Sequence, residues 1–254
     1  MWLKAKTCAL AVSLAAVLAL PAAAGVVPVT IGTSWDGPSQ TLQKIVDNRY
    51  GVGAINVQTD YMGAHPTDPD PWFWIDSRLS ALLVTEVAGN ADYNVVGWYL
   101  ENGTRPTIDG IDDGVIFNGV ATDGDMAYVT FDKPMTRFGF YLNPNGPFDA
   151  PFASEPEKFY TNRFYNDLGP SGGTALHAPY DGDVQALVFD VSRFTMPNTW
   201  LVCFEDLDAG SNPGAMGTSA TDNDYNDFVF EVTAFGATPT LPMTFGALKS
   251  KYLK

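Results

Sequence analysis

The chain has 254 residues, of which 29 are acidic and 14 are lysine or arginine, and its formal net charge is −15. A field of this sign repels nucleic acid and anionic lipid and attracts cations, so we exclude nucleic acid as a partner. The length suits one large β domain or two small ones.

The N-terminus has the pattern of an export signal. Lys4 and Lys6 precede an apolar run at residues 8–20, and a proline and three alanines follow it up to Ala24. A positive region, a short apolar run and small residues before a cut predict a signal peptide at residues 1–24. The run is too short to span a bilayer as a stable helix, so we expect it to be removed, with no stable membrane insertion. We therefore expect a secreted or cell-surface protein, with the periplasm as the alternative.

Removal of residues 1–24 changes both the charge and the cysteine content. The net charge moves from −15 to −17, because two lysines and no acid are lost. Cys203 is then the single cysteine, so an internal disulfide and an ordinary zinc site are excluded. It lies in an apolar run, and we expect it to be a small buried residue.

Two short helices are predicted before the strands begin. Ser39 can cap a helix at residues 40–48, and a second helix is predicted at residues 78–88 with Gly89 as its stop. In both segments the apolar residues follow helical spacing: Leu42, Ile45 and Val46 in the first, and Leu79, Leu82, Leu83 and Val87 in the second.

Alternating aromatic and β-branched runs predict at least eight strands after Gly89. They lie at residues 94–100, 114–117, 126–131, 137–142, 159–165, 185–191, 200–205 and 227–235. No alternation of strands and helices is visible, so a parallel sheet is disfavoured. The predicted fold is all-β: a single antiparallel β-sandwich domain at residues 25–235, jelly-roll-like, with the two short N-terminal helices.

Residues 236–254 read as a separate linker and basic tail. Pro239 and Pro242 mark the linker, and a short helix can begin at Thr244. Three lysines lie in the last six residues. The tail is either a frayed terminus or a docking or sorting segment for an acidic surface.

The most informative stretch is residues 205–227. It gathers eight side chains that carry oxygen ligands: Glu205, Asp206, Asp208, Asp222, Asn223, Asp224, Asn226 and Asp227. No lysine or arginine lies between Arg193 and Lys249, so neighbouring residues in the chain do not neutralise these acids. Like charges a few ångströms apart repel by about 1 kcal/mol per pair even in water. Calcium takes about 6–8 oxygen ligands, and this stretch can supply them.

Two alternatives to a calcium site of this kind were considered. The spacing of Asp222, Asp224 and Asn226 is that of an EF-hand start, but Asp227 and Thr233 stand where that loop needs glycine and glutamate, so we reject it. The other alternative is a solvated acidic turn without an ion. A second acidic group at residues 109–125 has the same two interpretations, a cation site or ordinary turns.

The combination of Phe204-Glu205-Asp206 with the segment at residues 222–230 resembles the signature of the "domain of unknown function 4114" family of secreted bacterial proteins. The upstream segments at residues 86–90 and 94–99 resemble parts of the same proteins. The resemblance implies a β-sandwich, a surface role and a calcium site. The implied ligands are Glu205, Asp206, Asp222, Asp224 and Asp227, with Asn226 as a further candidate.

We expect an exported, calcium-binding structural or adhesive module of the cell surface or matrix. Its partners are then a divalent cation and a surface polysaccharide or another matrix protein. The alternative is a calcium-dependent carbohydrate-binding domain, for which five aromatic residues were considered as stacking platforms: Trp72, Trp74, Trp98, Tyr160 and Tyr165. An enzyme is disfavoured, because no catalytic motif is present and no spacing selects a carboxylate pair such as Glu86 and Asp206.

Overall fold

The computed structural model describes most of the chain between residues 31 and 235. The described ranges are 31–32, 37–62, 73–75, 78–88, 91–131, 136–144, 158–166, 184–206 and 223–235. Within them the protein is all-β, with two five-stranded antiparallel sheets and one α-helix. The signal peptide predicted at residues 1–24 and the tail predicted at residues 236–254 lie outside the described residues.

The first sheet, sheet A, contains the aromatic-rich strand that the sequence predicts at residues 137–142. Its strand order is β1-β6-β3-β4, and β7 also pairs with β6. The strands are β1 (Phe73–Ile75), β3 (Val95–Leu100), β4 (Asp113–Phe117), β6 (Thr136–Asn143) and β7 (Phe159–Tyr160). A single-turn 3₁₀ helix, Ala91–Tyr93, precedes β3, and another, Arg163–Tyr165, follows β7.

The second sheet, sheet B, contains the strands that lead to the acidic residues. Its order is β5-β2-β10-β9-β8. The strands are β2 (Arg78–Thr85), β5 (Met126–Thr130), β8 (Ala186–Asp190), β9 (Thr199–Phe204) and β10 (Phe228–Phe235). Every pairing within it is antiparallel.

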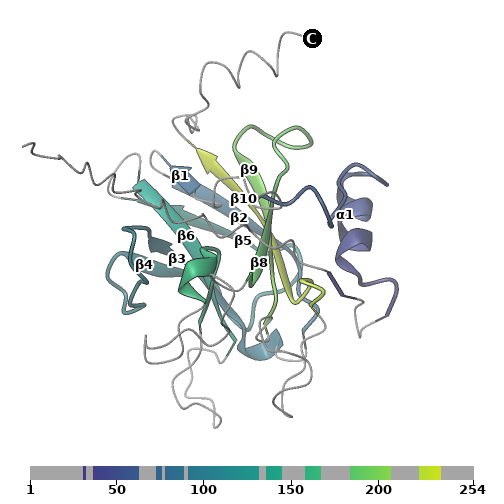
Figure 1. The fold of residues 1–254 in the computed structure, drawn as a ribbon. Coiled ribbons are helices and arrows are strands. Elements are labelled where there is room, and N and C mark those ends of the chain that lie inside the picture. Colours follow the sequence, from purple (N-terminus) through teal and green to yellow (C-terminus); the bar gives the residue numbers. More distant parts are fainter. Residues whose placement is uncertain are drawn as a thin grey trace, which may run out of the picture.

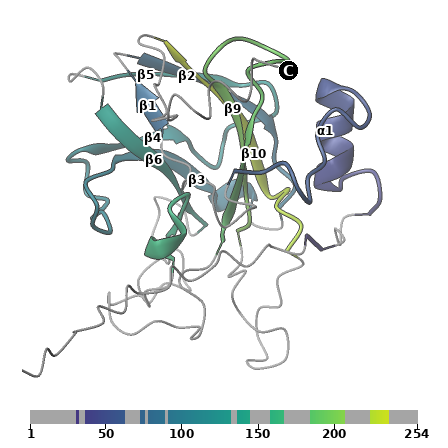
Figure 2. The same ribbon diagram turned by 45° about the horizontal axis from the view of Figure 1, so that its top comes forward.

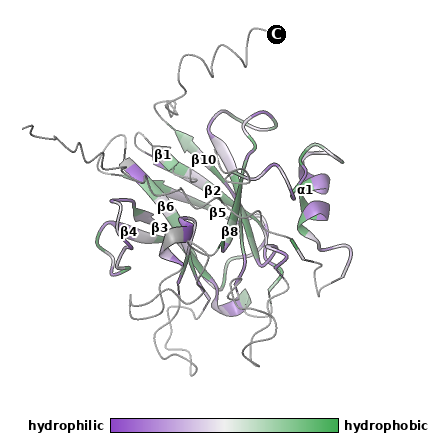
Figure 3. Cartoon of the chain, in the orientation of Figure 1, coloured by the Kyte–Doolittle hydropathy of each residue, from purple (hydrophilic) through white to green (hydrophobic). Residues whose placement is uncertain are grey.

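The main hydrophobic core lies between the two sheets and is rich in phenylalanine. Phe138 and Phe140 of sheet A face Phe228 and Phe230 of sheet B, and all four are buried. The rings of Phe140 and Phe230 meet edge to face with centroids 5.2 Å apart. Figure 3 shows the strands of both sheets as the most hydrophobic part of the chain. The sandwich prediction is therefore confirmed in its coarse form, whereas its jelly-roll likeness stays a prediction.

The second predicted helix, at residues 78–88, is wrong: this segment forms the strand β2. Leu79, Ala81 and Leu83 alternate into the core between the sheets, while Arg78 and Ser80 belong to the other face. Leucines at positions 79, 82 and 83 satisfy both a helical and a strand period, so spacing alone was ambiguous. Pairing with β10 on one side and β5 on the other decides it, because both edges of β2 gain hydrogen-bonded neighbours.

The first predicted helix is present as α1 (Leu42–Tyr50), two residues later than expected. Its cap is Thr41 rather than Ser39, and the Thr41 hydroxyl oxygen accepts a hydrogen bond from the Lys44 N–H at 3.3 Å. Leu42 and Val46 are buried in a second apolar cluster with the outer face of sheet B. Figures 1 and 2 show α1 beside β8, β9 and β10, with sheet A on the opposite side of sheet B.

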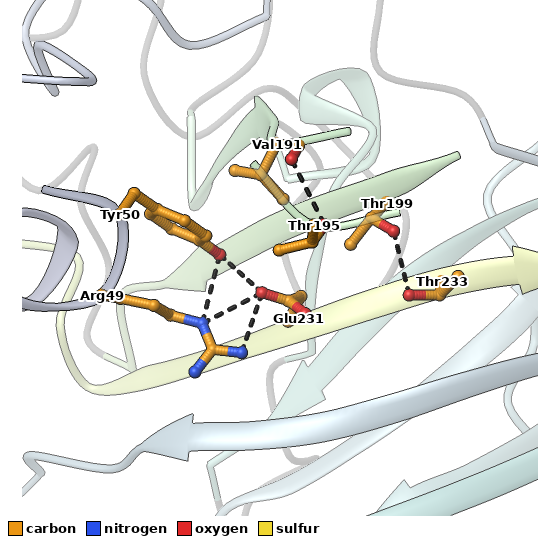
Figure 4. A network of polar contacts seen from close by, with 7 residues as sticks. All are labelled: Arg49, Tyr50, Val191, Thr195, Thr199, Glu231 and Thr233. Atoms are coloured by element: carbon orange, nitrogen blue, oxygen red, sulfur yellow. Dashed lines mark hydrogen bonds and ion pairs between the residues drawn. The ribbon is translucent and has the colours of Figure 1, made fainter. Parts of the chain in front are cut away.

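The last turn of α1 is fastened to the middle of β10 by a polar network (Figure 4). Glu231 accepts hydrogen bonds from the Tyr50 hydroxyl at 2.7 Å and from Arg49 Nε at 3.0 Å, and Arg49 also forms an ion pair with it at 2.9 Å. Burial, with the hydrogen bond to Glu231 second, raises the pKa of Tyr50 far above its ordinary value. The helix therefore covers sheet B with both an apolar face and a charged anchor.

No helix in the described part of the chain is both long and apolar enough to cross a membrane.

Candidate metal centre

The acidic residues meet at one end of sheet B because of its topology. Strands β2 and β9 both pair antiparallel with β10, so their last residues lie next to its first residues. This is the lower end of sheet B in Figure 1. Glu205 and Asp206 follow β9, and Asp227 immediately precedes β10. The sheet thereby joins acids that are about twenty positions apart in the sequence.

Three of these acids form a compact triad, Glu205, Asp224 and Asp227. One oxygen from each carboxylate lies within 4.8 Å of the others. The three residues are 1 %, 1 % and 8 % exposed, respectively. Within the described part of the chain, no other set of three histidine, cysteine or acidic side chains comes this close. The structure thus brings Glu205, Asp224 and Asp227 together, whereas their role as metal ligands stays a prediction.

The segment before β10 has an unusual backbone that orients the triad. Asn223 and Tyr225 both have positive φ, 53° and 56°, on either side of Asp224. Left-handed backbone costs roughly 1 kcal/mol or more for a bulky residue, so packing must hold Tyr225 in place. Tyr225 is buried, and its hydroxyl donates to the Val184 carbonyl at 2.8 Å. Its backbone N–H points at Glu205 Oε2 at 3.4 Å, which draws the two halves of the triad together.

Asp227 is the residue on which the surrounding electrostatics act most clearly. Burial raises its pKa far above the ordinary value, and the charges of Glu205, Asp206 and Asp224 raise it further. A hydrogen bond from the backbone N–H of Asp206 at 2.8 Å acts in the opposite direction and does not compensate. Buried carboxylates this close together must either keep protons or share a cation.

The structure gives the other predicted ligands different roles. Asp206 is buried, but it lies outside the triad and its side chain accepts a hydrogen bond from Asn94 Nδ2 at 3.3 Å. Asn226 is fully buried, and its amide donates to the Gln40 carbonyl at 2.7 Å, which ties the segment to the chain before α1. Asp222 lies outside the described residues. The described members of the predicted set are therefore divided between the triad and the residues that contact its surroundings.

The acids of the second group lie on both sides of β4, in the exposed segments at residues 109–112 and 122–125 and at the first residue of the strand, Asp113. The Asp113 carboxylate accepts hydrogen bonds from the backbone N–H groups of Asp109 and Gly110 at 3.0 Å. Asp125 accepts one from Thr122 N at 2.8 Å. These bonds are what aspartate supplies in ordinary turns, so they favour the turn interpretation.

Two residues of this end of the molecule were not predicted as ligands, Glu86 and Asn94. Glu86 follows β2, and Asn94 precedes β3 in the other sheet. Asn94 is fully buried and contacts Asp206. Placing residues 78–88 in a helix hid the position of Glu86, because a strand ending at Thr85 brings it to the same end of the sheet as Asp227.

Of the five candidate sugar platforms, Trp72 and the side chain of Trp74 lie outside the described residues, and the other three are buried or partly buried. Tyr160 and Tyr165 are 3 % and 5 % exposed and pack with Tyr99 in a buried tyrosine cluster. Trp98 is partly buried, with its ring centroid 4.6 Å from that of Phe131. Tyr160 and Tyr165 therefore cannot stack on a sugar. Cys203 is fully buried, as expected.

No family model, no curated protein and no solved structure matches this chain. The resemblance to the "domain of unknown function 4114" family therefore rests on the residues quoted for it and stays a prediction.

Proposed function

We propose that this protein is an exported module that binds calcium through Glu205, Asp224 and Asp227 and uses the ion to stabilise its fold at the cell surface or in a matrix. The observation that carries the proposal is the buried triad, with three carboxylate oxygens inside 4.8 Å. Export and the surface role rest on the sequence pattern of residues 1–24 and on the family resemblance.

The donor set favours calcium over other common ions. Carboxylate, amide and carbonyl oxygens are hard ligands, and calcium accepts about 6–8 of them in flexible geometry. Magnesium is smaller and keeps more of its water, while zinc and copper prefer nitrogen or sulfur ligands. Cys203 belongs to the apolar cluster beside α1, so it supplies no sulfur ligand to the triad.

The position of the triad explains how an ion would act on the fold. Glu205 directly follows β9, Asp227 directly precedes β10, and residues 206–226 lie between them in the chain. An ion held by both would cross-link the ends of two adjacent central strands. It would also neutralise the repulsion among the buried acids. Because the site does not exist in the unfolded chain, most of the free energy of ion binding would then stabilise the folded state.

Differential scanning calorimetry on the mature protein tests this proposal. An ion bound only by the folded state at about 100 times its Kd adds about 2.7 kcal/mol to the free energy of unfolding. For a domain of this size that corresponds to a rise of about 5–10 °C in Tm between excess chelator and excess calcium. Isothermal titration should show calcium binding to the same sample.

Asp224→Asn is the informative variant, because it keeps the shape and removes one charge from the triad. We expect it to fold, to have a higher Tm than the wild type in chelator, and to lose most of the calcium-induced rise. Asp190→Asn is the control, since Asp190 is exposed at the far end of β8. A wild-type Tm that is equal in calcium and in chelator would remove the proposal.

A further inference from the structure

A second group of polar side chains lies beside the triad without belonging to it. It consists of Glu86 after β2, Asn94 before β3 and Asp206 after β9. Asn94 comes from the chain segment that enters sheet A, while the two acids come from sheet B. The group therefore bridges the two sheets at the end of the sandwich where the triad also lies.

Asn94 is the central residue of the group. It is fully buried, and its Nδ2 donates to Asp206 Oδ2 at 3.3 Å. A hydrogen bond from Asn94 also reaches Glu86, where it opposes the rise of the Glu86 pKa. The Asn94 Oδ1 atom, by contrast, is buried and has no hydrogen-bond partner. An unsatisfied buried carbonyl oxygen is unfavourable, and this one belongs to the amide group whose nitrogen donates to the two carboxylates.

Glu86, which follows β2 in sheet B, also has a buried side-chain oxygen that lacks a partner. Its Oε1 is buried without a hydrogen-bond partner. Burial raises the pKa of Glu86 to about 7, and the charges of Asp206, Asp123 and Asp92 add to the increase. Asp92 and Asp123 are exposed, so the group has an acidic rim that opens to solvent.

We propose that Glu86, Asp206 and the Asn94 side-chain oxygen form a second calcium site, with the exposed Asp92 and Asp123 at its entrance. Rotation of the Asn94 amide by half a turn brings Oδ1 to the two carboxylates, an arrangement that is favourable only around a cation. Two carboxylates and one amide leave several coordination positions to water, so this site binds more weakly than the triad. Its side chains are different from those of the triad, although the two sites are adjacent, since the backbone N–H of Asp206 donates to Asp227 at 2.8 Å.

The competing explanation is purely structural: the Asn94 amide holds two carboxylates together through its N–H groups. Asn94→Asp separates the two explanations. In a calcium site the new carboxylate is an additional charged ligand, and we expect calcium to bind the second site about tenfold more tightly than in the wild type. The variant should have a lowered Tm in chelator that calcium restores to at least the wild-type value. A Tm that stays low in calcium would overturn the second site.

Calcium stoichiometry by isothermal titration and equilibrium dialysis gives the second test. We expect two ions per chain in the wild type and in the control Asp190→Asn, and one in Glu86→Gln and in Asp224→Asn. Two ions in Glu86→Gln, or one wild-type ion that only Asp224→Asn removes, would overturn the second site and leave the triad. One wild-type ion that only Glu86→Gln removes would support the second site and overturn the triad as the calcium centre. A wild type that binds no calcium would overturn both.

Discussion

Asp227 combines burial with three neighbouring acids, and this determines how stability should depend on pH. Its pKa is raised in the folded state, so the folded protein holds a proton that the unfolded chain has already released. The stability that this proton contributes in the absence of calcium is fully present below the unfolded pKa of about 4 and is lost as the pH rises toward the raised folded pKa. Glu86, with a pKa of about 7, contributes in the same direction between pH 4 and 7.

We therefore predict that the free energy of unfolding, measured by urea denaturation in chelator, decreases between about pH 5 and pH 8. In Asp227→Asn this decrease should be smaller, because the amide has no proton to lose and can still accept from the Asp206 N–H. Calcium should reverse the trend in the wild type, since protons compete with the ion for the same oxygens. An equal pH slope in the wild type and the variant would contradict the assigned role of Asp227.

Gly97 is a residue at which close packing leaves no room for a side chain. A Cβ added there would lie 2.3 Å from the Gly114 carbonyl oxygen and 2.3 Å from Tyr141 Cζ. Since one of these atoms belongs to the backbone of the paired strand β4, Gly97→Ala should force sheet A apart and cost roughly 1–3 kcal/mol. Urea denaturation of the variant measures this, and a loss below about 0.5 kcal/mol would show that β3 and β4 can separate without penalty.

At the scale of the elements, the anchor of α1 uses different residues from the candidate metal centre. Glu231→Gln removes the charge that binds both Arg49 and Tyr50. The pair is only partly exposed, so we expect a loss of about 1–2 kcal/mol in the free energy of unfolding. Calcium should still raise the Tm by the wild-type amount, because Glu231 lies in the middle of β10, four residues along the chain from Asp227. A reduced calcium effect would show that the helix and the ion site are coupled.

The sequence predicts an element correctly where its apolar residues follow only one spacing, that of a strand or that of a helix. The eight strands after Gly89 were identified because aromatic and β-branched residues alternate between clear turns, although the segment at 159–165 is a two-residue strand followed by a 3₁₀ turn. The helix predicted at residues 78–88 is wrong because the leucines there fit the spacing of a helix as well as that of a strand. Pairing with β5 and β10 makes this segment a strand.

The candidate site was predictable to the extent that its acids are close in sequence. Asp224 and Asp227 lie in one short segment, and the absence of nearby lysine and arginine marked it. Asn94 could not be found in this way, because it reaches Asp206 from the other sheet across 112 positions. Nor could spacing show that Asp206 faces Asn94 and Glu86 while its neighbour Glu205 faces the triad, since adjacent residues point in opposite directions only once the strand is known.

At the scale of the whole molecule, a net charge of −15 opposes compaction throughout the chain. We predict that sodium chloride raises the Tm of the protein in chelator, because screening weakens this repulsion. Calcium at about 1 mM should raise the Tm further than the same concentration of magnesium, since only a site with defined oxygens distinguishes the two ions. Equal effects of both ions at matched ionic strength would indicate general screening in place of a specific site.

The most direct measurement is a crystal structure of residues 25–254 grown in calcium, with anomalous diffraction collected at a wavelength at which calcium scatters. The account predicts an anomalous peak about 2.3–2.6 Å from the carboxylate oxygens of Glu205, Asp224 and Asp227. Carboxyl groups that bond directly to one another through shared protons, or that turn apart into solvent with no peak between them, would contradict it.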